Sequence, residues 1–354
     1  MRKILTVGTI FVSGIAVATL LAVVFFSLFR PVSYAQTSPD VKDDQKMLVI
    51  LANFKDTTVL SPNPEQVLKT MDLVNQFYQE NSYYNAAIDR GIKVTGVKNP
   101  DRGADVVGVY TLPISNDCSF SPVAGAAISA ANNDVDLTQY TGVVILAPFN
   151  CPWSGTDFPV TLQFAAKNGP VSLFVNEAGL PSPYTDAQIE PSAQTIAHEI
   201  GHALGLGHAD MLDCGDVALA GTCTDVPYLG YFGIMGYTVT DIDAIQREVL
   251  GWLSSSNIQT VTSSGRYTIE PLETASNGVK VLKIPRVTSK IKTQYTVDGS
   301  TETCDSAVST ACKYPYFYIE YRQPIGFDTR LPSKIFTGAL VHIGPGGPTA
   351  LPNP

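Results

Sequence analysis

Residues 198–210 read HEIGHALGLGHAD and contain three of the four histidines of the chain. His198 and His202 are four residues apart, so on an α-helix their imidazoles lie about 40° apart around the axis and about 6 Å apart along it. Two imidazoles on one helix face can bind one metal ion at neighbouring corners of a tetrahedron. This stretch therefore predicts a metal-binding helix.

The residues around this stretch favour a helix with one apolar face. Pro191 fits the first helical turn, where its missing N–H group is not needed, and Ser192 is a candidate N-cap. Gly201 favours the helix less than alanine would by about 1 kcal/mol, so its place between the histidines indicates close packing. The apolar stripe lies nearly opposite the histidines and is expected to face the core; it comprises Ala193, Ile196, Ala197, Ile200 and Leu204.

Gly205 and Gly207 follow the helical stretch and are expected to end it, because glycine readily adopts left-handed backbone geometry. A turn at this point brings His208 back toward the first two histidines as a third ligand. Three histidines leave the fourth position of a Zn²⁺ ion for water, whose pKa the metal lowers to about 7. Glu199 is then placed to act as the general base and afterwards as the general acid.

The extended pattern H-E-x-x-H-x-x-G-x-x-H resembles the zinc-binding motif of the metzincin clan of endopeptidases. Members of that clan carry a methionine turn beneath the metal, and YFGIMGY at 231–237 resembles this turn. The resemblance implies that Met235 forms a hydrophobic floor and that Tyr237 approaches the zinc ion or stabilises the oxyanion. For both side chains the alternative is ordinary packing in the core.

Further segments resemble the gametolysin and immune-inhibitor-like bacterial peptidases of this clan. They are LVILANF at 48–54, NQFYQENSYYN at 75–85, REVLGWL at 247–253, YIEYRQPIGFD at 318–328 and GALVHIG at 338–344. The resemblance spans residues 47–344 and implies an exported zinc-dependent endopeptidase that acts on protein or peptide substrates. An extended substrate is expected to pair with the exposed edge of a strand at 171–175.

Strand-like and helical segments alternate between residues 47 and 254, which predicts an α/β (α+β) domain of metzincin type with a twisted sheet and the active-site helix. Residues 255–354 predict a β-rich, sandwich-like module, because Gly, Pro, Ser and Asn interrupt their short strand-like segments. Residues 36–46 are polar and indicate a linker. Helices are expected at 64–80 and 124–131, and strands at 47–54, 92–97, 106–112, 143–147, 171–175, 259–262, 267–270, 279–284, 292–297, 316–321 and 339–343.

The first 35 residues have a composition of their own. Arg2 and Lys3 precede an uncharged apolar run at 4–29, and the small residues Ser33 and Ala35 resemble a signal-cleavage site. The run is also long enough to span a bilayer, so residues 1–35 are either a signal peptide or a membrane anchor. The protein is accordingly expected to be secreted, or to be anchored by 4–29 with its catalytic domain outside.

The chain as a whole is acidic, with 23 basic and 32 acidic residues and a formal net charge of −9. Nucleic acid is therefore not expected as a partner, because phosphate binding requires a basic surface. A membrane is expected as a partner only through an uncleaved N-terminal segment. The oligomeric state stays open.

Six cysteines form an even set without a C-x-x-C pair: Cys118, Cys151, Cys214, Cys223, Cys304 and Cys312. In an exported chain such a set predicts disulfides rather than a cysteine metal site. Proximity favours Cys214–Cys223 and Cys304–Cys312, which leaves Cys118–Cys151. Buried free thiols are the alternative.

Other polar residues carry weaker signals. His342 lies in an apolar strand-like segment and is expected to be structural. Asp210 either orients His208 by accepting from the ring nitrogen that does not face the metal, or caps the next turn. Asp241 and Asp243 resemble part of a calcium loop, but no full series of ligands surrounds them.

Two functions other than proteolysis are compatible with the motif. The first is a zinc-binding protein that does not cleave, which Glu199 disfavours because a site without turnover has no need of that carboxylate. The second is a cell-surface binding or adhesion protein whose function resides in residues 255–354.

Overall fold

A buried strand of ten residues, β1 (Gln45–Phe54), forms the centre of a parallel sheet. It pairs with β2 (Val94–Thr95), β3 (Asp105–Leu112) and β4 (Gly142–Leu146), and β4 pairs with β5 (Ser172–Asn176). The computed structural model describes residues 43–56, 63–85, 91–115, 120–148, 172–176, 189–216, 221–226, 229–236, 238–286, 293–297, 300–302 and 314–345.

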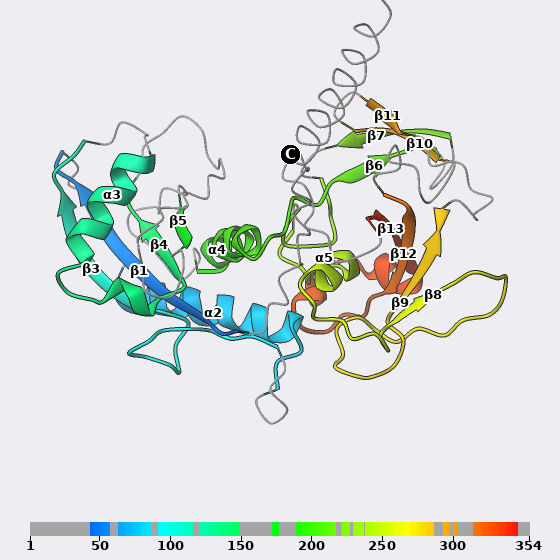
Figure 1. Cartoon of the computed structure of the whole chain (residues 1–354), viewed down its shortest axis with the longest axis horizontal. Coiled ribbons are helices and arrows are strands. Elements are labelled where there is room, and N and C mark those ends of the chain that lie inside the picture. Colours follow the sequence, from blue (N-terminus) through cyan, green and yellow to red (C-terminus); the bar gives the residue numbers. More distant parts are fainter. Residues whose placement is uncertain are drawn as a thin grey trace, which may run out of the picture. The chain divides into compact units, whose positions relative to one another are not determined.

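Helices cover both faces of this sheet (Figure 1). Val49 and Leu51 of β1 pack with α2 (Pro64–Asn81) and α4 (Ile189–Ala203), whereas Leu48 and Ile50 pack with α3 (Phe120–Ala131) on the opposite face. Parallel strands that are buried on both faces are apolar throughout, which explains the unbroken apolar run at 47–52 inside β1. Helix α4 lies against both α2 and β5.

The strand expected at 92–97 is reduced to the two residues of β2. The backbone N–H groups of Val97, Lys98 and Asn99 donate to the carboxylate of Asp105 at 2.8–3.0 Å, so they are not available for a sheet ladder. The hydroxyl of Tyr140 donates to the same carboxylate at 2.7 Å. The carboxylate of Asp105 therefore takes the backbone N–H groups that a longer strand would have donated to a neighbouring strand.

Two further sheets have four strands each. One has the order β11 (Ser300–Glu302), β10 (Thr293–Val297), β7 (Gly221–Val226) and β6 (Met211–Asp213). The other has the order β13 (Ala339–Gly344), β12 (Tyr316–Tyr321), β9 (Val281–Pro285) and β8 (Ile258–Thr260). Helix α5 (Ala244–Val249) packs Ala244 and Ile245 on this last sheet. Short 3₁₀ helices, η2 (Leu137–Gln139), η5 (Gly326–Arg330) and η6 (Ser333–Thr337), complete the described elements.

The expectation of a mixed α/β fold is confirmed, with differences in detail. The strand expected at 267–270 is wrong: these residues form a loop in which Glu270 donates a single backbone bond to Val279 at 2.7 Å. The expected N-cap is also wrong, because α4 begins at Ile189 and Ser192 is buried inside the helix. The domain boundary expected at 254/255 stays a prediction, although β10 and β11 share a sheet with strands that precede it.

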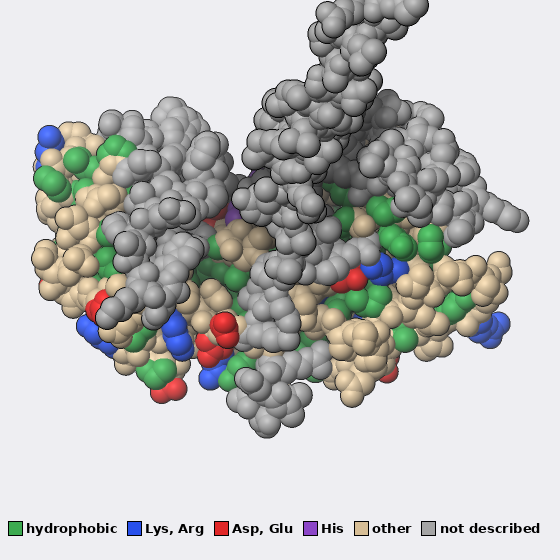
Figure 2. All heavy atoms as spheres, viewed as in Figure 1, with side chains coloured by type: hydrophobic (Ala, Val, Ile, Leu, Met, Phe, Trp, Pro, Cys, Tyr) green, Lys and Arg blue, Asp and Glu red, His purple; other side chains and the backbone are tan. Residues whose placement is uncertain are grey.

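The N-terminal 42 residues, with the predicted signal or anchor at 1–35, lie outside the described residues. Every described residue belongs to one compact unit, Ser38–Pro354. Among these residues, no helix combines the length and the apolar character needed to cross a bilayer. Figure 2 shows acidic and basic side chains interspersed on the described part of one face.

Candidate metal centre

The apolar stripe of α4 lies in the core, as expected, and leaves the histidines on the opposite side of the helix. Ala193, Ile196 and Ile200 are buried against β1 and α2. His198 and His202 are half-buried. Their imidazoles are therefore partly accessible to solvent.

Gly205 ends the helix and turns the chain back. Its φ is +96°, and its N–H donates to the carbonyl of His202 at 2.9 Å. The N–H of Leu206 donates to the carbonyl of Gly201 at 3.0 Å. This pair of bonds is a Schellman motif, which reverses the chain direction after a helix. The predicted break at Gly205 is confirmed, and it returns His208 to the first two histidines.

The three imidazoles meet through their Nε2 atoms. The Nε2 atom of His202 lies 3.1 Å from that of His198 and 3.0 Å from that of His208. One ligand atom from each of the three residues lies within 4.8 Å of the others. The cluster could therefore hold a metal ion.

Backbone carbonyls fix the orientation of two of these rings. Nδ1 of His198 lies 2.8 Å from the carbonyl oxygen of Ile234, and Nδ1 of His202 lies 2.9 Å from that of Leu206. A carbonyl oxygen can only accept, so each Nδ1 carries a proton, and the tautomer that this selects has its lone pair at Nε2. Lone pairs that face one another repel unless they share a cation. A bond from the other ring N–H group to a backbone carbonyl is the common way in which metal-ligating histidines are oriented.

Glu199 lies on the same helix, between His198 and His202 in the sequence, and is only 8% exposed. Tyr78 of α2 packs behind it and donates its hydroxyl to the carbonyl of Ala197 at 2.7 Å. Burial, with a contribution from the negative charge of Glu199, raises the pKa of Tyr78 well above its usual range. Tyr78 therefore stays protonated and pins α4 to α2, a role that sequence analysis missed.

The turn that contains Met235 lies directly against α4. Met235 is fully buried, and a Cβ atom added to Gly201 would collide with its Sδ atom. The close packing expected at Gly201 is therefore confirmed. The N–H of Gly236 closes the turn by donating to the carbonyl of Gly233 at 3.1 Å.

The same turn supports the residue that follows the third histidine. The N–H of Ala209 donates to the carbonyl of Met235 at 2.8 Å, and the N–H of Gly230 donates to the carbonyl of Ala209 at 2.9 Å. Gly236 approaches Gly230 so closely that no side chain fits between them. The turn thus holds the segment of His208 on one side and His198, through Ile234, on the other.

Several expected site residues lie elsewhere or outside the described residues. Tyr237 lies outside them, so its expected role at the oxyanion stays a prediction. Asp210 is exposed between His208 and β6, and neither of its expected roles is tested. The strand expected at 171–175 is present as β5, the last strand in the order of its sheet.

The residues considered for calcium have structural partners. Asp243 is the N-cap of α5 and accepts from the N–H of Gln246 at 2.9 Å. Asp241 forms a fully buried ion pair with Arg247 at 3.2 Å. His342 lies in β13, within 3.3 Å of Glu320 and apart from the histidine cluster.

The disulfide expected between Cys214 and Cys223 is confirmed. It joins the segment after β6 to β7, and so braces the antiparallel pair that begins three residues after His208. The other four cysteines, Cys118, Cys151, Cys304 and Cys312, lie outside the described residues, and their pairing stays a prediction.

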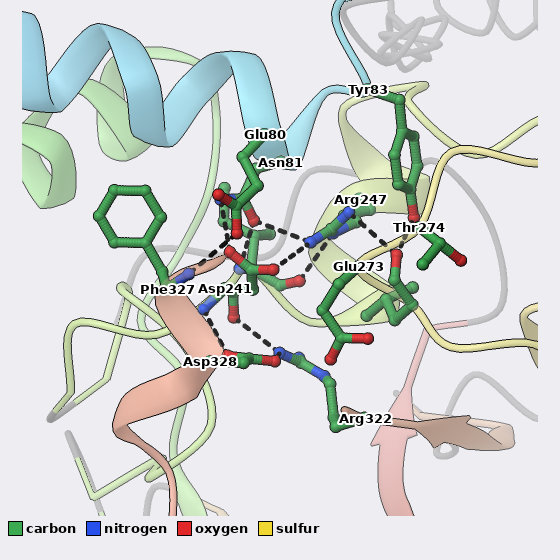
Figure 3. Close-up of polar contacts among 12 residues, drawn as sticks. Glu80, Asn81, Tyr83, Asp241, Arg247, Glu273, Thr274, Arg322, Phe327 and Asp328 are labelled. Carbon is green, nitrogen blue, oxygen red and sulfur yellow. Dashed lines mark hydrogen bonds and ion pairs between the residues drawn. The ribbon is translucent and has the colours of Figure 1, made fainter. Parts of the chain in front are cut away.

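A buried polar network behind the methionine turn was not predicted (Figure 3). Burial disfavours the charge of Arg322, but the carboxylates of Glu320 and Asp328 outweigh this effect and raise the pKa of the guanidinium well above its usual range. The only signal in the sequence is the presence of charged residues within apolar segments. We use the name polar network for Asn81, Asp241, Arg247, Glu320, Arg322 and Asp328.

Comparison of the sequence with protein-family models and with curated proteins finds no match.

Proposed function

We propose that the protein is an exported zinc-dependent endopeptidase with a metzincin-like active site. The observation that carries this proposal is the convergence of three Nε2 atoms, two of them from the helix that also carries the buried residue Glu199. A metal site alone requires only the three histidines. The additional carboxylate on the same helix supplies the proton acceptor that hydrolysis requires.

Zn²⁺ is the metal that fits this donor set best. Zinc in proteins is bound by imidazole nitrogen in tetrahedral geometry, and two nitrogens at about 2.0–2.1 Å from one zinc ion lie about 3.3 Å apart. The Nε2 separations of 3.0 and 3.1 Å agree with this spacing. When bound, the zinc ion supplies Lewis acidity to a water molecule and to the scissile carbonyl group.

Glu199 performs the proton transfers in this proposal. Its carboxylate accepts a proton from the attacking water and later donates it to the amine that leaves. The partial burial of the three histidines and the burial of Glu199 support this role, because a partly desolvated site favours proton transfer to a positioned carboxylate. The protein or peptide substrate is proposed to pair with the edge of β5, which lies next to α4.

The finer architecture belongs to the same proposal. Residues 47–254 form a metzincin-type catalytic domain, and residues 255–354 form a β-rich, sandwich-like module. Export agrees with the Cys214–Cys223 disulfide, because disulfides persist in oxidising compartments.

The deciding experiment compares wild type with Glu199→Gln, each loaded with one equivalent of zinc, on a mixed peptide library. We expect the variant to retain zinc and to lose at least about 100-fold in cleavage rate, because general base catalysis contributes about 10²–10⁴-fold. Glu190→Gln is the matched control. Glu190 lies on the first turn of the same helix, is exposed and pairs with Arg330, so its loss should leave cleavage unchanged.

The main alternative is a zinc-binding protein that does not cleave, such as a cell-surface binding or adhesion protein. Zinc-loaded wild type that leaves every library peptide intact would support it. Cleavage by wild type and by Glu190→Gln, but not by Glu199→Gln, would exclude it.

A further inference from the structure

The polar network connects the methionine turn to the C-terminal part of the chain. Arg322 follows β12 directly, and its side chain is fully buried. Its Nη2 group donates to the carbonyl of Phe232 at 3.3 Å, and its Nη1 group donates to the carbonyl of Asp241 at 3.2 Å. One side chain thus holds the backbone on both sides of the turn.

Carboxylates fix this guanidinium in place. Glu320 accepts from Nε of Arg322 at 2.6 Å, and Asp328 accepts from Nη1 at 2.7 Å. The other oxygen of Asp328 accepts from the N–H of Asp241 at 2.9 Å. Arg322 and Asp328 therefore clamp Asp241 through its carbonyl and its N–H together.

Helix α2 completes the clamp from the opposite side (Figure 3). The side-chain amide of Asn81 donates through Nδ2 to the carboxylate of Asp241 at 3.0 Å. Its Oδ1 atom accepts from the N–H of Ile242 at 2.7 Å and from Nη2 of Arg247 at 3.0 Å. The carboxylates of Asp241, Glu320 and Asp328 face two guanidinium groups in a space without solvent exposure. Such a set is stable only while every partner is present, since an unpaired buried charge is strongly destabilising.

The connection to the metal ligands is short. Only Gly233 separates Phe232 from Ile234, whose carbonyl oxygen lies 2.8 Å from Nδ1 of His198. The next residue, Met235, holds the segment of His208 through Ala209 at 2.8 Å. We propose that Arg322 is a positioning residue for the metal centre, which acts by holding the methionine turn in the place where it orients two of the three histidines.

This inference rests on the proposed metal site but not on peptidase activity. It also means that residues 314–345 are part of the metal-binding structure rather than a dispensable appendage. Lysine cannot replace Arg322, because a single ammonium group lacks the planar fork that reaches two carboxylates and two carbonyls at once.

The test uses the full chain with Arg322→Lys and, as a milder change, Asp328→Asn. Zinc affinity is measured by competition with a chelator, and the geometry of the site by the visible absorption spectrum of the Co²⁺-substituted protein. We expect both variants to bind zinc about 10-fold more weakly and to show altered Co²⁺ bands, as changes behind metal ligands typically do. Arg286→Lys is the matched control, because Arg286 is a buried arginine of the same sheet region that donates to the carbonyl of Tyr314.

The possible outcomes separate the claims. Folded variants with wild-type zinc affinity and spectrum would overturn the positioning role, as would an equal loss in Arg286→Lys. If Arg322→Lys does not fold, the zinc affinity and Co²⁺ spectrum of Asp328→Asn decide whether the network positions the metal centre. If neither variant folds even with zinc, the network stabilises the whole chain and the positioning role is overturned. A wild type that does not bind zinc overturns the metal site itself. A selective loss of affinity in proteins that cleave nothing supports the positioning role and rejects the peptidase.

Discussion

Gly201 of α4 and Met235 of the methionine turn pack closely together, and a Cβ atom added to Gly201 would collide with the Sδ atom of Met235. Gly201→Ala should therefore lower the free energy of unfolding. Overpacking in a core costs about 1–3 kcal/mol, which exceeds the roughly 1 kcal/mol that alanine gains in a helix. Denaturant unfolding of the zinc-free protein measures the effect without a contribution from the metal.

Gly125→Ala is the matched control for this prediction. Gly125 is an exposed residue of α3, and a Cβ atom there meets no atom within 4 Å. Without a clash, the substitution should stabilise the protein by about 0.5–1 kcal/mol. If both alanines stabilise the protein equally, the contact between Gly201 and Met235 is not tight.

Zinc should stabilise the folded protein through all three histidines. At a free zinc concentration 100 times its Kd, wild type should gain about 2.7 kcal/mol in the free energy of unfolding. His202→Asn should lose most of this gain, because His202 is the ring whose Nε2 atom lies close to both others. Unfolding in zinc and in chelator gives the difference.

His342→Gln retains all three proposed ligands and should keep most of that gain. Equal zinc stabilisation of wild type and His202→Asn would show that the metal binds elsewhere.

The ion pair between His342 and Glu320 should make stability depend on pH. Burial lowers the pKa of His342, but the charge of Glu320 outweighs burial and raises it above 6.5. A histidine with a raised pKa contributes its full stabilisation below the pKa of the unfolded chain and loses it as the pH rises through the folded value. Wild type should thus lose stability above pH 6.5 relative to His342→Gln.

Free energies of unfolding on both sides of pH 6.5 test this prediction. The difference between the two proteins isolates His342, because the three clustered histidines are present in both. A difference that does not change with pH would rule out the ion pair.

The Cys214–Cys223 disulfide should stabilise the chain by closing a short loop. For a sequence separation of nine residues, loop closure is worth about 2–3 kcal/mol. Replacing both cysteines by serine should lower the free energy of unfolding by about that amount while zinc stoichiometry stays at one. Calorimetry and metal analysis of the double variant give both values, and loss of zinc would show that the disulfide also maintains the site.

The parts of the site that could be predicted from sequence are local. His198 and His202 share a face because of the helical period, and Gly205 ends the helix because of its own backbone freedom. The carbonyls of Ile234 and Leu206 that orient the rings have no side-chain signature, so no pattern in the sequence marks them.

The polar network was unpredictable for a different reason. Arg322 contacts a carbonyl 90 residues earlier in the chain, and Asn81 contacts a guanidinium 166 residues later. Charged residues are normally placed at the surface by sequence reasoning, because burial of a charge is favourable only with partners that the sequence does not locate. The same limit explains why β2 is shorter than expected. The N–H groups of Val97 and Lys98 donate to the carboxylate of Asp105 in β3, a contact that the sequence does not locate.

The position of Arg322 in the chain sets an order of assembly. All three histidines are synthesised more than one hundred residues before Arg322, and chains fold from the N-terminus as they emerge. A nascent or truncated chain that ends before β12 thus carries every proposed ligand but lacks the clamp that fixes two of them. If Arg322 positions the metal centre as proposed, tight metal binding is expected only after the chain has been synthesised through Asp328.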